Sequence, residues 1–145
     1  MKHSKIISAV LAATIMGTSM TAVASAKELS SANTSIVAPC YAIASNPVSQ
    51  LSISGTTAYC SSKVSGPSVK SITAEQTLEK FWGLWIWNEV DGGYWNETLS
   101  ISSGKVTNNI SGLSSGKYRL KSVFTLTTSN GKTETFTVYS DEKSL

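Results

Sequence analysis

Tryptophan is the residue type in this chain with the clearest binding chemistry, and all four tryptophans lie between Trp82 and Trp95. Phe81 and Tyr94 belong to the same segment, which holds half of the aromatic residues. Aromatic rings stack on the C–H faces of pyranose sugars, while a few polar groups around them fix the orientation of the ligand. The candidate ligand-binding residues are therefore Trp82, Trp85, Trp87, Tyr94 and Trp95.

Side chains that could bind sugar hydroxyls lie within this segment or next to it: Asn88, Glu89, Asp91 and Asn96. In an extended strand Trp85 and Trp87 share one face, and Leu84 and Ile86 share the other. Both faces are then apolar, so one of them must face water. An exposed aromatic surface normally marks a contact with a ligand, a partner or a membrane.

Two alternatives remain open for this segment. In the first, the rings pack on one another at one end of the domain, and the protein is structural or surface-associated with no small ligand. In the second, residues 75–87 form a helix with Leu78, Trp82 and Trp85 on one face, although Gly83 weakens it by about 1 kcal/mol. An amphipathic helix of this kind suits a membrane-active or antagonistic secreted factor. The sequence does not decide between strand and helix here.

The sequence offers few of the residue types that catalysis or metal binding requires. The single histidine, His3, lies in the N-terminal segment that we expect to be removed on export. The mature chain therefore has no imidazole for a Ser-His-Asp, Cys-His or histidine-rich metal site. Glu89, Asp91 and Glu97 lie beside the aromatic residues, but a small domain without a deep cleft is a poor glycosidase. Asp91-Gly92-Gly93 lacks the repeated carboxylates of a calcium loop. We expect no enzymatic activity, no metal and no cofactor.

The first 26 residues predict export. Residues 1–5 are basic, residues 6–16 are mostly apolar, and Ala24-Ser25-Ala26 is a small-residue cleavage site. This is the pattern of a secretory signal peptide cleaved after Ala26. We expect a secreted, extracellular protein that begins at Lys27 and has no transmembrane segment in its mature chain.

The mature chain is predicted to be one domain behind a short leader. Residues 27–39 lack hydrophobic periodicity, which favours a flexible leader, and residues 40–145 have the length of one domain. The formal net charge of +3 includes Lys2 and Lys5, so signal removal leaves +1. Basic residues are mostly scattered singly, so we expect no nucleic acid partner, and we expect a monomer.

Two cysteines, Cys40 and Cys60, remain in the mature chain. An even number of cysteines in an exported chain predicts one disulfide, here closing a loop of about twenty residues and worth about 3 kcal/mol.

Short alternating runs of apolar and polar residues predict an all-β domain, either a sandwich or a barrel. The runs cover residues 51–54, 58–60, 72–79, 99–101, 106–110, 118–126 and 136–138. Turn residues separate them at Gly55-Thr56-Thr57, Gly66-Pro67, Ser103-Gly104 and Asn130-Gly131. Asn130-Gly131 predicts a hairpin with a type I′ turn, in which both central residues have positive φ.

The spacing Leu113-x-x-Gly116-x-Tyr118 resembles the tyrosine corner of fibronectin type III and other immunoglobulin-like domains. The resemblance implies an immunoglobulin-like antiparallel β-sandwich of about seven strands. It also implies that the hydroxyl of Tyr118 bonds back to the backbone at the start of the penultimate strand.

A wider resemblance covers residues 40–140. It rests on Leu51-Ser-Ile-Ser-Gly, Ala58-x-Cys60, Leu78-Glu79-Lys80 and Gly116-Lys-Tyr-Arg-Leu-Lys. Together these motifs resemble a group of small secreted single-domain proteins of unknown function from Gram-positive bacteria. The resemblance implies export and the sandwich fold, and it brings no catalytic residues. The function expected from the sequence is therefore a secreted, non-catalytic binding module for a glycan or a cell-envelope component.

Overall fold

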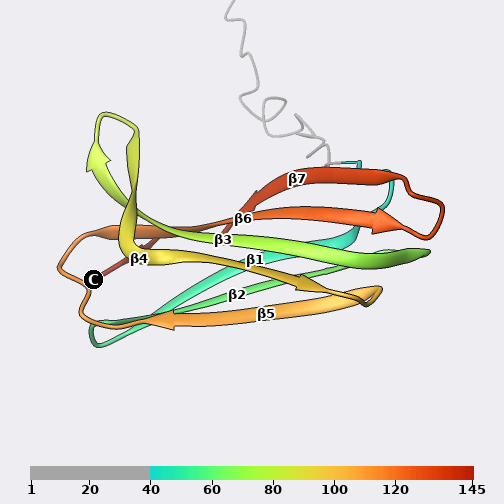
Figure 1. Cartoon of the computed structure of the whole chain (residues 1–145). Coiled ribbons are helices and arrows are strands. Elements are labelled where there is room, and N and C mark those ends of the chain that lie inside the picture. Colours follow the sequence, from blue (N-terminus) through green and yellow to red (C-terminus); the bar gives the residue numbers. More distant parts are fainter. Residues whose placement is uncertain (1–39) are drawn as a thin grey trace, which may run out of the picture. The chain divides into compact units, whose positions relative to one another are not determined.

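The computed structural model describes residues 40–145, so the predicted signal peptide and the predicted leader lie outside the described residues. The described part of the chain contains strands and no helix (Figure 1). The strands are β1 (Ser45–Ser54), β2 (Thr57–Ser65), β3 (Val69–Gly83), β4 (Ile86–Leu99), β5 (Ser103–Ile110), β6 (Lys117–Thr128), β7 (Thr133–Tyr139) and β8 (Lys143–Ser144).

Two antiparallel sheets form the domain. One has the order β1-β2-β5, and the other has the order β4-β3-β6-β7 with the short β8 also paired to β6. The prediction of an all-β antiparallel architecture is confirmed, with eight strands in place of the expected seven or so. Residues 75–87 belong to β3, β4 and the turn between them, so the helical alternative is wrong.

Alternation of buried and exposed residues places the core. In β3, Ile72, Ala74, Gln76 and Leu78 are buried, whereas the residues between them are partly exposed. The same pattern runs through β6 from Tyr118 to Thr128. Since side chains alternate between the faces of a strand, each sheet presents one face to the other sheet and one to water.

A polar network crosses the middle of this core. Ser122 Oγ hydrogen-bonds to Ser49 Oγ at 2.8 Å and to Ser62 Oγ at 2.6 Å. Gln76 Nε2 donates to Ser62 Oγ at 2.6 Å, and Asn108 Nδ2 donates to Gln76 Oε1 at 2.8 Å. The five residues come from five strands and both sheets. In residues 40–145 no buried side-chain nitrogen or oxygen lacks a partner.

Two apolar clusters lie on either side of the polar network. The first cluster is Leu51, Ala58, Cys60, Leu78, Leu113, Tyr118 and Leu120. The second cluster is Val64, Val69, Ile72, Ala74, Val106, Phe124 and Leu126. The core is therefore apolar at both ends of the sandwich and hydrogen-bonded at its centre.

The tyrosine corner motif lies at the end of the first cluster. Leu113 and Tyr118 are buried, and the Tyr118 hydroxyl donates to the carbonyl oxygen of Ser114. This is the hydrogen bond that the resemblance to immunoglobulin-like domains implies. Gly116 exchanges two backbone hydrogen bonds with Leu145, so the end of the chain is attached to the same corner.

The hairpins form largely where the turn residues predict them. The hairpin around Gly55-Thr56 and the hairpin around Asn130-Gly131 are both confirmed. The type I′ turn is wrong, because positive φ (83°) occurs at Gly131 and not at Asn130. Thr128 N donates to Lys132 O, so the loop has three residues and ends in a left-handed glycine. The turn predicted at Ser103-Gly104 lies instead between Leu99 and Ser103.

The segment before β1 is fastened to β7 by one carboxylate. Backbone N–H groups of Ala42, Ile43 and Ala44 donate to Glu134 at 2.7, 2.8 and 2.9 Å. Burial raises the pKa of Glu134, but these three donors together outweigh it and hold the pKa below its usual value. The carboxylate therefore stays ionised and holds the entering chain beside the second cluster.

The predicted disulfide between Cys40 and Cys60 is wrong, because both cysteines are free thiols. Cys60 belongs to the first cluster. It lies five residues before Ser65 at the end of β2, which is about 16 Å along the strand. Cys40 lies two residues before Ala42, where the segment that Glu134 holds beside the second cluster begins. A disulfide needs Cα atoms within about 7 Å of each other, and the cysteines lie in different halves of the sandwich.

The two thiols should differ sharply in reactivity. Burial raises the pKa of the Cys60 thiol to about 12, whereas Cys40 is exposed. Since the thiolate is the reactive form, we expect iodoacetamide at pH 8 to modify Cys40 alone in the folded protein and both cysteines in denaturant. Mass spectrometry of peptides after labelling measures this. A folded protein in which neither cysteine is labelled until reductant is added would show a disulfide and contradict the structure.

Candidate functional site: the β3–β4 hairpin arm

A local insertion divides the β3–β4 hairpin into two parts. Thr77 pairs with Tyr94, but the next pair is Glu79 with Glu89, so residues 90–93 of β4 oppose one residue of β3. Bulges of this kind bend a strand and increase its twist. Figure 1 shows the hairpin turning away from the two layers at this point. We call residues 79–89 the hairpin arm.

Gly93 allows the bend. A Cβ atom at this position would lie 2.8 Å from the carbonyl oxygen of Val90 and 3.1 Å from the Cβ of Leu78. Because any side chain would collide with the backbone of the insertion, glycine is required for the chain to fold back so closely. Gly93 is therefore required for the bend at the start of the arm.

The turn of the arm is conformationally strained. Gly83 pairs with Ile86, so Leu84 and Trp85 form a two-residue loop, and their φ angles are +48° and +68°. This is the backbone of a type I′ turn, for which asparagine and glycine are the usual residues. A left-handed conformation costs a bulky residue about 1–2 kcal/mol. Strain of this kind persists where the surrounding structure enforces it and is common at functional sites.

Four large apolar side chains gather at the end of the arm. The exposed fraction is 90% for Trp85, 89% for Leu84, 73% for Trp82 and 53% for Ile86. We call these four residues the apolar tip. Leaving such side chains in water forgoes about 1.5–3 kcal/mol each that burial would provide. An exposed apolar cluster on strained backbone is the feature of a contact surface.

Arg119 fastens the base of the arm to the sandwich. Its guanidinium carbon lies 4.2 Å from the ring centroid of Trp87 and 4.3 Å from that of Tyr139. Its Nε donates to the carboxylate of Glu79 at 2.7 Å. Phe81 packs beside Trp87, with ring centroids 5.2 Å apart. One side chain of β6 therefore contacts β3, β4 and β7, and these contacts hold the arm in a fixed direction.

The five candidate residues do not form one surface. Trp82 and Trp85 belong to the apolar tip, and Trp87 lies under Arg119 at the base of the arm. Tyr94 pairs with Thr77 on the outer face of its sheet, whereas Trp95 pairs with the buried Gln76 and packs against the first cluster. Trp85 and Trp87 therefore do not share a strand face, because Trp85 is in the turn.

Sequence reasoning missed Leu84 and Ile86 as site residues. Residues 82–87 contain no Asn-Gly, Asp-Gly or proline signal, so the turn cannot be located from its residue types. The acidic residues near the aromatic segment do not form a catalytic pair either. Glu79 and Glu89 are cross-strand neighbours, but Glu79 is bound by Arg119.

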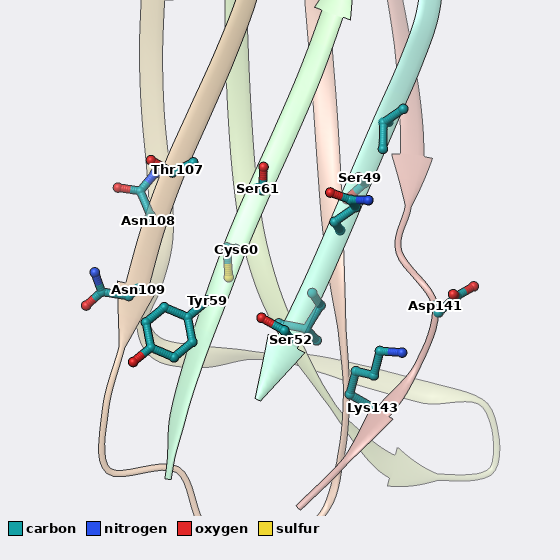
Figure 2. A pocket seen from close by; sticks show the side chains of 13 residues that line it. Ser49, Ser52, Tyr59, Cys60, Ser61, Thr107, Asn108, Asn109, Asp141 and Lys143 are labelled. Carbon is teal, nitrogen blue, oxygen red and sulfur yellow. The ribbon is translucent and has the colours of Figure 1, made fainter. Parts of the chain in front are cut away.

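A second surface lies on the outer face of the three-stranded sheet, as a groove of about 740 Å³. The groove is lined by Val48, Ser49, Gln50, Leu51, Ser52, Tyr59, Cys60, Ser61, Thr107, Asn108, Asn109, Asp141 and Lys143. Since Leu51 and Cys60 face the core, their neighbours Ser52 and Tyr59 face outward. Figure 2 shows Tyr59 and Asn109 side by side on β2 and β5, with Asp141 and Lys143 beyond β1.

The central part of this groove is uncharged. Register places Gln50, Ser61 and Thr107 in one row across the three strands, and Ser52, Tyr59 and Asn109 in the next. On the other side of the Gln50 row, Val48 pairs with Lys63, and Lys63 pairs with Lys105. The lysines therefore lie outside the central part. Amide and hydroxyl groups around an aromatic ring can bind a neutral polar ligand.

Within residues 40–145 no group of three or more His, Cys, Asp or Glu side chains is placed to hold a metal ion. Over the same residues no helix is long and apolar enough to cross a membrane.

Comparison with known proteins finds little that resembles this chain. No family model matches it, and no curated protein matches it. Two crystal structures of OgpA from Akkermansia muciniphila resemble it, a catalytically inactive form with an O-glycopeptide (glycodrosocin) substrate and the wild type, with TM-scores of 0.33 and 0.36 and 15% identity. The matches cover 64% and 72% of this chain, but only 27% and 31% of the OgpA chains.

The strain in the turn predicts that residues suited to positive φ would make the protein more stable. We expect the double substitution Leu84→Asn/Trp85→Gly to raise the free energy of unfolding by about 1–2 kcal/mol, because both residues suit positive φ. Urea denaturation of the protein and the variant measures the difference. A loss of stability would mean that the tip side chains support the fold and are not held in strain.

Proposed function

We propose that this protein is an exported, non-catalytic binding module that contacts the cell envelope through its apolar tip. The observation that carries the proposal is the turn at Leu84 and Trp85, where side chains about nine-tenths exposed sit on left-handed backbone. Neither burial nor backbone preference accounts for this choice of residues. A contact made outside the domain accounts for both.

The structural alternative fits the geometry less well. If the aromatic segment only closed one end of the sandwich, its rings would be packed on one another. Phe81 and Trp87 do pack together, and Trp95 packs on the core. Trp82 and Trp85 remain mostly exposed, so the tip has a surplus of apolar surface that the fold does not use.

We also infer that the domain is an immunoglobulin-like sandwich of the kind found in small secreted proteins of Gram-positive bacteria. With strands lettered as in that fold, β1, β2 and β5 take the positions of A, B and E. The neighbours β3, β6 and β7 take the positions of C, F and G, and β4 adds the edge strand C′. The Tyr118 hydrogen bond to Ser114 supports the same assignment.

Retention on cell envelopes tests the function. We expect the purified protein to sediment with isolated Gram-positive envelopes, which contain membrane and wall, and the Leu84→Asn/Trp85→Gly variant to be retained at least about tenfold less. Loss of two large apolar contacts easily accounts for this factor. Quantitative immunoblots of pellet and supernatant measure it.

A matched control is available at the opposite end of the domain. Ile101 lies in the β4–β5 turn and is 46% exposed, so Ile101→Ser removes an exposed apolar side chain away from the arm. This variant should be retained like the wild type. Equal retention of the tip variant and the wild type, or no retention of either, would refute the function.

A glycan ligand is a second candidate, and the uncharged groove favours it. Tyr59 is 50% exposed and is surrounded by amides and hydroxyls, including Asn109 beside it and Gln50 in the next row. Such a surface offers a stacking ring and neutral hydrogen-bonding groups to a sugar. This site is separate from the apolar tip.

An array of bacterial wall and host mucin glycans tests the second candidate. We expect Tyr59→Ala and Asn109→Ala each to weaken retention of a bound glycan about tenfold, because each removes one stacking or hydrogen-bonding group. The Leu84→Asn/Trp85→Gly variant should bind as the wild type does. An array on which the wild type retains no glycan would rule the groove out as a sugar site.

A further inference from the structure

We propose that the partner of the apolar tip is a lipid bilayer, into whose interfacial region Leu84 and Trp85 insert. The inference rests on the proposed function, since both use the same tip. The occupant of the apolar tip is lipid, and not a wall polymer or a protein.

The uncharged length of the arm matches the depth of a bilayer interface. Residues 81–88 contain no charged side chain, and the next charged residues along the two strands of the arm are Lys80 and Glu89. At about 3.3 Å per residue, Lys80 lies about 10 Å from Gly83 at the turn. Peripheral elements bury their apolar side by about 5–10 Å at the boundary of headgroups and acyl chains. The tip can therefore enter to this depth without burying a charge.

The shape of the arm disfavours a folded protein as partner. A stable protein interface buries about 800 Å² on each side and involves roughly 20–30 residues. Here four apolar side chains stand at the end of a narrow two-stranded ribbon. A convex point this small can enter a fluid interface but offers little surface for a protein to cover.

The backbone of the arm sets a limit to the depth. The pairing of β3 with β6 ends at Lys80 and Tyr118, so in the described structure residues 81–83 pair with β4 alone. Unpaired N–H and C=O groups along a ribbon edge cannot be satisfied in hydrocarbon. The interfacial region still contains water and headgroups, so the ribbon fits there and does not fit deeper.

Aromatic and cationic groups lie at the level where headgroups would be. Trp82 and Trp87 flank the turn, and tryptophan is enriched at membrane interfaces. Behind them, Lys117 Nζ lies 5.8 Å from the Phe81 ring centroid, and Arg119 lies over Trp87.

The charges at the base of the arm are balanced. Lys117 pairs with Glu142 at 3.0 Å, and Arg119 pairs with Glu79 at 2.7 Å. Lys80 is positively charged and Glu89 is negatively charged, so their charges cancel as well. The attraction to an anionic surface is therefore small. Binding should depend on the apolar tip, require no anionic lipid and resist salt.

Vesicles of phosphatidylcholine alone test the inference. We expect the purified protein to sediment with them, with the partition coefficient unchanged between about 0.1 M and 0.5 M NaCl. Leu84→Asn/Trp85→Gly should reduce the partition coefficient at least about tenfold, and Trp85→Phe, which keeps an apolar ring, should retain most of it. Ile101→Ser should partition as the wild type does. Acyl-chain bromination should quench tryptophan emission in the wild type and less so in the tip variant.

The outcomes separate the inference from the function on which it rests. Tip-dependent retention on envelopes without binding to phosphatidylcholine vesicles would overturn the bilayer and leave the function standing. Envelope retention that is lost after protease treatment would point to a protein receptor and would also overturn the bilayer. If the protein bound only anionic vesicles and salt abolished that binding, attachment would depend on charge. This outcome would also overturn the bilayer inference. Absence of binding to both envelopes and vesicles would refute inference and function together.

Discussion

The buried hydrogen-bond network at the centre of the sandwich is the constraint on which the other features depend. Gln76, Ser62 and Ser122 connect the two sheets where they face each other, and Ser49 and Asn108 extend the network to β1 and β5. A slip of one residue in any of these strands would turn a polar side chain outward and leave its partner buried and unpaired. Each unpaired group would cost about 1–3 kcal/mol, so the network defines one register for both sheets.

A fixed register in β3 and β6 decides the direction of the arm. Arg119 can contact Glu79, Trp87 and Tyr139 only because β3 pairs with β6 through the whole core and continues to Lys80. Cation–π and charge-assisted contacts of this kind contribute more where they are partly desolvated. The sandwich thus stabilises an arm whose own turn is unfavourable, which allows Leu84 and Trp85 to remain in left-handed backbone and in water.

The two outer surfaces of the domain differ in chemistry because they differ in position. The apolar tip is a turn outside both layers, where no second sheet can bury its side chains. The groove is the water-facing side of β1, β2 and β5, where alternation requires polar residues and leaves Tyr59 as its single aromatic ring. Any binding by the groove would rely on hydrogen bonds, and binding by the tip would rely on burial of apolar surface.

The sequence by itself determined the all-β class, the alternation along β3 and β6, and the hairpins at Gly55 and Gly131, because strand period and turn residues are local properties. It also located the aromatic segment and the corner motif at Tyr118. Only the tertiary structure decided that Cys40 and Cys60 lie in different halves of the sandwich, since their distance depends on how Glu134 holds the entering chain. The division of the tryptophans among tip, base and core was likewise decided by nonlocal pairing, because residues 90–93 shift the register of β4 against β3 and bend the arm away from the layers.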